Sequence, residues 1–169
     1  ALLQGFFTQR LVQQKQVSPH TIASYRDTFR LFLQFAQKRR HKTPGQLAFE
    51  DVDAPLIAEF LHDLENNRQI SARSRNLRLT AIRSFFQYAA YEAPAHTAQI
   101  QRVLAIPSKR YDRKQVQFLS QPEIKALVEA PDATTWSGQR DRLLLLIAIQ
   151  TGLRLSELRN LEPKDLALG

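Results

Sequence analysis

The sequence predicts an all-α protein, and three observations lead to this fold class. Apolar residues recur at spacings of three and four along most of the 169 residues, as in helices that bury one face. Several of these stretches follow a serine or aspartate, and at Ser18-Pro19 a proline comes next, which is typical of a helix start. Hydrophobic residues make up 43% of the chain, which is sufficient for a packed core and argues against global disorder.

Four helices and a short fifth one are expected in the first 105 residues. The apolar stripes and start signals place them at about 2–11, 18–38, 54–67, 71–91 and 99–104. Pro44-Gly45 marks a turn between the second and third helices, and Pro94 ends the fourth. Residues 1–105 are therefore expected to form one helical domain.

An interdomain linker is expected at residues 106–117, where apolar residues are few. Proline and basic side chains dominate this stretch, at Pro107, Lys109, Arg110, Arg113 and Lys114. Such a composition is typical of an extended connection between domains. A second domain, incomplete within this sequence, is then expected at residues 118–169, beginning with a helix that starts at Ser120.

The charge of the chain is uneven. Lys and Arg number 24 against 16 acids, and residues 1–119 hold 18 basic and 9 acidic side chains, whereas residues 120–169 hold 6 and 7. A basic N-terminal part is typical of a protein that binds a polyanion; ordinary surface charge that keeps the protein in solution is the alternative. The basic residues are not gathered on one strongly apolar helix, so a membrane is not an expected partner.

Several other classes of site are not expected. Cysteine is absent, which excludes disulfides and thiolate metal sites and fits a cytoplasmic location. The four histidines are scattered at positions 20, 41, 62 and 96 without paired spacing, so no metal is expected. There is also no glycine-rich phosphate loop.

The string Thr151-Gly-Leu-Arg-Leu-Ser-Glu-Leu158 predicts a corner between two helices. An apolar run, 143–149, leads into Gly152, where a positive φ is cheap and the helix can stop. Arg154 follows, and we expect apolar packing on both sides to hold it so that its guanidinium can bind a planar anion such as a phosphate. Glu157, one turn on, can reach back to orient it. The alternative is an arginine that is solvated or bridges to a nearby acid.

Four segments resemble, in order and spacing, the opening of the catalytic domain of tyrosine recombinases, the phage-integrase and Xer-type family. They are Phe118-Leu-Ser-Gln-Pro-Glu123, Arg140-Asp-Arg-Leu-Leu144, the 151–158 string and Leu161-Glu-Pro-Lys-Asp-Leu166. The preceding part resembles the family's core-binding domain. The resemblance implies a four- to five-helix core-binding (SAM-like) domain followed by a truncated, mainly helical start of the catalytic domain. It also implies that Arg154 is the first of two arginines on the scissile phosphate and that Glu157 is its supporting acid.

The candidate DNA-binding residues lie on the second and fourth helices. Projected at about 100° per residue, the apolar stripe of the fourth helix leaves a polar face that has donors and almost no acid. Arg and Asn side chains can pair with base edges or phosphates. The resemblance adds the start of the second helix, although Thr21 could only support that start and Arg26 could only flank the core. The expected set is His20, Thr21, Ser24, Arg26, Arg73, Arg75, Asn76, Arg78, Thr80 and Arg83.

Two assignments carry alternatives from the residues themselves. Arg75 and Arg78 fall closer to the apolar stripe of the fourth helix, and we expect them to overhang its N-terminal end or to extend out from the stripe. The basic cluster Lys38-Arg39-Arg40 with Lys42 either interacts with the helix dipole or contacts phosphate.

The resemblance implies site-specific DNA recombination or integration, in which a tyrosine hydroxyl attacks a phosphorus atom without metal or cofactor and protomers assemble as tetramers on DNA. The sequence contains no His-x-x-Arg pair, and no tyrosine follows Arg154. We therefore expect this polypeptide mainly to bind double-stranded DNA without cleaving it, whereas a longer parent would be the enzyme. The alternatives are a stand-alone helical DNA-binding regulator and a helical protein-interaction module.

Overall fold

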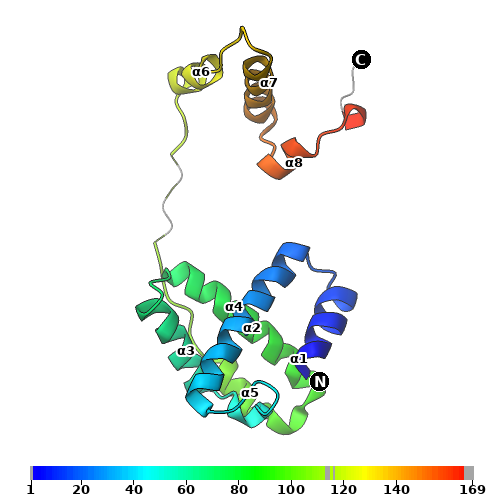
Figure 1. The fold of residues 1–169 in the computed structure, drawn as a ribbon, viewed down its shortest axis with the longest axis vertical. Helices are drawn as coiled ribbons and strands as arrows, with labels where there is room; N and C mark the ends of the chain where they lie inside the picture. Colours follow the sequence, from blue (N-terminus) through cyan, green and yellow to red (C-terminus); the bar gives the residue numbers. More distant parts are fainter. Residues whose placement is uncertain (1, 113–114, 116, 166–169) are drawn as a thin grey trace. The chain divides into compact units, whose positions relative to one another are not determined.

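The computed structural model describes residues 2–112, 115 and 117–165, and the chain forms two compact units that divide between positions 113 and 114. All regular secondary structure in these described residues is helical (Figure 1). The prediction of an all-α protein is therefore confirmed.

The described residues of the first unit form five α-helices. In chain order they are α1 (Leu2–Gly5, continued by a π-helix over Phe6–Gln14), α2 (Pro19–Arg40), α3 (Ala54–Asn66), α4 (Ala72–Glu92) and α5 (Thr97–Leu104). The expected helices are present, with α5 beginning two residues earlier than predicted because a short 3-10 turn at 94–96 leads into it.

The first helix differs from the prediction in its winding. A plain amphipathic helix was expected, but most of it hydrogen-bonds in the wider π pattern, and the Lys15 amide donates to the Arg10 carbonyl at 3.0 Å. This wider winding brings residues five apart to one side. Phe6 and Leu11, five apart, are both buried, so core packing accounts for the change.

Side-chain caps begin the helices where the sequence placed them. The Ser18 hydroxyl accepts from the Thr21 amide, Asp53 accepts from the Leu56 amide at 2.9 Å, and Ser71 accepts from the Ser74 amide. Each cap satisfies an amide that has no partner inside its helix. These local bonds fix the starts of α2, α3 and α4.

The core of the first unit is rich in aromatic rings. α4 packs against α2, α3 and α5 and also contacts α1. The fully buried side chains come from all five helical segments, including Phe6, Phe60, Phe86, Leu79 and Ile100. α4 is therefore buried along its apolar stripe, which leaves its other faces to carry polar side chains.

The second unit is thinner. It holds α6 (Gln121–Glu129), α7 (Trp136–Thr151), α8 (Leu155–Arg159) and a 3-10 turn at Pro163–Asp165, and α7 packs against α6 and α8. Among its described residues only Gly138 is buried, and large apolar side chains such as Phe118, Trp136 and Leu155 are exposed. The expected apolar packing on both sides of Arg154 is not seen in the described residues, because Leu155 is exposed and Leu153 and Leu158 are only half-buried.

Candidate nucleic-acid interface

The start of α2 presents a small polar surface. His20 and Ser24 are exposed and lie one turn apart on one side of the helix. Thr21 is half-buried, and its hydroxyl lies 3.0 Å from that of Ser18, so it supports the helix start. Arg26 is exposed and forms no ion pair with a described residue, but it points about 200° around the helix from Ser24. The structure therefore brings His20 and Ser24 together and leaves Arg26 apart.

The expected residues of α4 divide between two faces. Arg73, Asn76, Thr80 and Arg83 fall within an arc of about 80° at 100° per residue. Arg73 and Thr80 are exposed, and the Thr80 hydroxyl donates to the Asn76 carbonyl of its own helix at 2.9 Å. Arg75 and Arg78 project from other sides of the helix and are much less exposed.

Arg78 connects α4 to α2. Its guanidinium donates to the buried Thr28 hydroxyl at 3.0 Å and to the Ser24 carbonyl at 3.4 Å, and it lies 2.6 Å from the Asp27 carboxylate. The hydrogen bond from Arg30, together with that from Arg78, holds the pKa of Asp27 below its usual value. Arg78 thus has three partners inside the protein, at the place where the DNA-facing start of α2 was expected.

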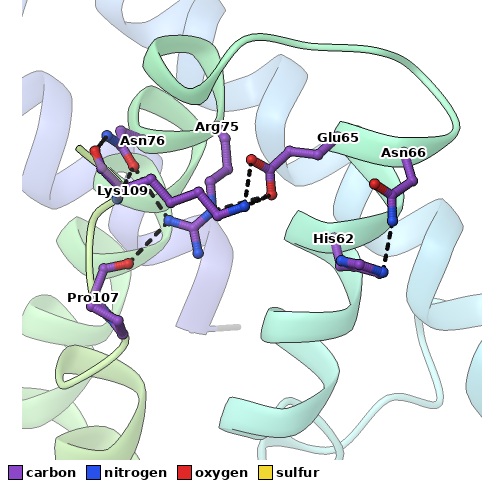
Figure 2. A network of polar contacts seen from close by, with 7 residues as sticks. All are labelled: His62, Glu65, Asn66, Arg75, Asn76, Pro107 and Lys109. Carbon is purple, nitrogen blue, oxygen red and sulfur yellow. Dashed lines mark hydrogen bonds and ion pairs between the residues drawn. The ribbon is translucent and has the colours of Figure 1, made fainter. Parts of the chain in front are cut away.

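Arg75, Asn76 and Arg83 contact the chain that leaves α5. We call residues 106–109 the exit segment. The Asn76 amide group donates to the Lys109 carbonyl at 2.7 Å, and its oxygen accepts from the Lys109 amide at 3.0 Å (Figure 2). Arg75 donates to the Pro107 carbonyl at 3.0 Å, and Arg83 donates to the Ile106 carbonyl. Three of the expected DNA-binding side chains are therefore bonded to the beginning of the predicted linker.

A carboxylate completes this network. Glu65, at the end of α3, accepts two hydrogen bonds of 2.9 Å from the Lys109 ammonium group and lies 3.7 Å from the Arg75 guanidinium (Figure 2). Arg75 is 7% exposed, so the acid balances a charge that is almost out of water. Neither Glu65 nor its contact with Lys109 was expected from the sequence.

The basic cluster at the end of α2 is largely matched by acids. Arg39, Arg40 and Lys42 form ion pairs with Glu59, Asp53 and Asp51, respectively. The hydrogen bond from Lys42, with one from the Ala48 amide, holds the pKa of Asp51 below its usual value. Lys38 has no ion pair with a described residue, and it borders an open hollow of about 830 Å³ that Arg68 and Phe35 also line. Three of these four cations are thus engaged within the protein.

The corner in the second unit has the predicted backbone. Gly152 has φ +68°, as expected for the residue that ends α7, and Arg154 occupies the N-cap of α8. The Glu157 carboxylate accepts from the Arg154 amide at 2.7 Å and from its guanidinium at 3.1 Å. The Arg154 side chain is 83% exposed, so its remaining donors face solvent. The contact fits an oriented anion-binding arginine and also fits an ordinary surface ion pair.

Two absences are stated for the part of the chain that the structure describes. No three His, Cys, Asp or Glu side chains there are placed to hold a metal ion. No helix in that part has both the length and the hydropathy needed to cross a membrane.

Comparisons with known proteins place these features in context. Residues 5–93 match the family described as phage integrase, N-terminal SAM-like domain. Two proteins of Sinorhizobium fredii (strain NBRC 101917 / NGR234) are similar over 99% of the chain: "Putative integrase/recombinase y4rC", 64% identical, and "Putative integrase/recombinase y4rD", 43% identical. The tyrosine recombinase XerD of Staphylococcus aureus (strain N315) is 34% identical over 94% of the chain.

The chain spans only about half the length of these relatives, 51%, 59% and 51% respectively. No solved structure matches the chain significantly.

Proposed function

The chain belongs to the tyrosine recombinase family, and from this premise we propose that its first unit binds double-stranded DNA through the start of α2 and the exposed face of α4. The observation that carries the proposal is the surplus of cations on the first unit that no neighbouring acid balances. Arg73 on α4 is exposed and forms no ion pair with a described residue, and the same holds for Arg26, which lies on another side of α2 from His20 and Ser24. Such side chains can neutralise phosphates by losing contacts with water, without breaking an ion pair inside the protein.

Within this proposal the polar side chains have different tasks. His20, Ser24, Arg73 and Thr80 are free to face DNA, because none of them donates a side-chain hydrogen bond to another segment of the described chain. Arg26 points about 200° around α2 from Ser24, so we do not group it with them. Thr21 supports the start of α2, and Arg78 fastens α4 to α2. The domain bounds of 1–105, 106–117 and 118–169 remain our assignment.

We assign the second unit to the beginning of the catalytic domain. In a longer parent protein, Arg154 would bind the scissile phosphate with its solvent-facing donors, and Glu157 would hold it in place. Fixed donors of this kind stabilise the negative charge that builds on the nonbridging oxygens as a tyrosine attacks. The parent would then recombine or integrate DNA at specific sites as an assembly of protomers, whereas this chain alone would bind without cleaving.

DNA binding is tested by its dependence on salt. Affinity for a 30-base-pair duplex of mixed sequence is measured by fluorescence anisotropy between 50 and 200 mM NaCl. If three phosphates are neutralised, the slope of log affinity against log salt is about −2.7, and affinity falls by about 40-fold across this range. An affinity that does not change with salt would remove the proposal.

A further inference from the structure

We infer that Glu65, Asn76 and Arg83 are positioning residues that bind the exit segment to α4 and so set where the chain leaves the first unit. The position of this path next to the DNA-binding surface rests on the proposed function, whereas the contacts of the exit segment do not. Asn76 and Arg83 then hold the exit segment instead of contacting DNA, and Glu65 and Lys109 take part in the same contacts.

Asn76 recognises backbone, not a side chain. Its donor and its acceptor both bind Lys109, one the carbonyl at 2.7 Å and the other the amide at 3.0 Å. A carboxamide is the side-chain group that can satisfy both atoms of one residue in this way. Aspartate would keep the acceptor but lose the donor, and its charge would face a carbonyl oxygen. The pairing therefore fixes the orientation of the backbone at Lys109.

Glu65 binds the same residue from a second helix. It lies between the Lys109 ammonium group at 2.9 Å and the nearly buried Arg75 guanidinium at 3.7 Å. Arg75 in turn donates to the Pro107 carbonyl. Removing the acid would leave a guanidinium in a nearly dry site without a counter-charge and would release the side chain of Lys109. These contacts thus connect the end of α3, the start of α4 and the exit segment (Figure 2).

Arg83 fixes the other end of the exit segment. It donates to the Ile106 carbonyl and to the Ser108 hydroxyl. Asn76 and Arg83 are seven residues apart, or about 10 Å along the helix axis, which is the reach of three extended residues. Since Ile106 lies at Arg83 and Lys109 at Asn76, the exit segment runs antiparallel to α4 in an extended conformation.

This path has two consequences. The chain is directed toward the N-terminal end of α4, where Arg73 is exposed, and the exposed Arg110 is the next residue along the chain. The tether to the second unit also begins at Arg110 instead of residue 106. Four held residues shorten its span by about 13 Å when extended.

Hydrogen–deuterium exchange of the whole chain, followed by mass spectrometry, tests the inference directly. Asn76→Ala and Glu65→Gln are each expected to speed exchange at least tenfold in the peptide covering residues 105–111. Exchange in the middle of α4 should stay within twofold of the unchanged protein. Arg73→Ala is the matched control, because it lies on the same helix and should leave the 105–111 peptide unaffected. Unchanged exchange at 105–111, or equal acceleration throughout α4, would overturn the inference.

The salt dependence of DNA binding shows whether Arg83 binds the exit segment or contacts a phosphate. For Arg83→Gln, the slope of log affinity against log salt should lie within about 0.3 of the slope for the unchanged chain. For Arg73→Ala, the magnitude of this slope should fall by about 0.9. A reduction of about 0.9 for Arg83→Gln would show a phosphate contact and overturn its reassignment. If the unchanged chain does not bind DNA at all, the proposed function fails, while the exchange experiment still decides whether the exit segment is held.

Discussion

Replacing Arg78 with alanine should destabilise the first unit, although this residue was expected from the sequence to contact DNA. Its hydrogen bond to Thr28 joins a charged donor to a hydroxyl that is 1% exposed, and such a bond contributes about 1.5 kcal/mol. The ion pair with Asp27 is partly exposed, with side chains 25% and 36% accessible, so solvent screening limits it to about 0.5 kcal/mol. The expected loss is therefore about 2 kcal/mol.

Native-state hydrogen exchange is a suitable assay because the slowest amides of α4 report the opening of the whole first unit. A loss of about 2 kcal/mol corresponds to about 30-fold faster exchange. Arg73→Ala is again the control, since it makes the same change of residue on the same helix without removing a partner, and it should alter exchange less than threefold. If Arg78→Ala leaves the slowest amides unchanged and instead flattens the salt dependence of DNA binding, the structural role argued for Arg78 is wrong.

Two other predictions concern pH and catalysis. Because the pKa of Asp27 is lowered in the folded protein, its contribution to stability is complete above its usual value of 3.8 and is lost as pH falls through the lower folded value. Asp27→Asn should therefore reduce the acid-induced loss of stability below pH 4 in urea unfolding experiments, and identical acid profiles would contradict this. The chain should form no covalent adduct with a nicked suicide DNA substrate on a denaturing gel, and an adduct would refute the proposal that the chain binds without cleaving. Replacing Arg154 with alanine should change the affinity of the chain for duplex DNA less than twofold.

Features that depend on neighbouring residues were predictable from the sequence. The caps at Ser18, Asp53 and Ser71 each join residues three apart, and Gly152 needs only its own backbone freedom to adopt φ +68°. The contact between Glu157 and Arg154 also spans three residues. Such interactions follow from helix geometry alone, so the start signals and spacings were sufficient to predict them.

Contacts between distant segments were not predictable in this way. Projection of α4 at about 100° per residue puts Asn76 and Arg83 on one face with Arg73. It could not indicate that the exit segment, more than 20 residues later, returns to bond with that face. The partners of Arg78 are 50 or more residues away, and the π winding of residues 6–14 arises from core packing of Phe6 and Leu11. No local pattern distinguishes a polar face that binds DNA from one that binds the protein's own backbone.

The four arginines at positions 73, 75, 78 and 83 show why basic residues cannot simply be counted as phosphate contacts. A phosphate that binds Arg78 must compete with Asp27, and one that binds Arg75 must reach a guanidinium that is 7% exposed and balanced by Glu65. Breaking an internal ion pair opposes such binding, so these arginines are less available to neutralise phosphates and to displace counterions from DNA. Arg73 is exposed to water and pairs with no carboxylate among the described residues. The salt dependence of DNA binding should therefore reflect the cations without an acidic partner and not all 18 basic residues of positions 1–119.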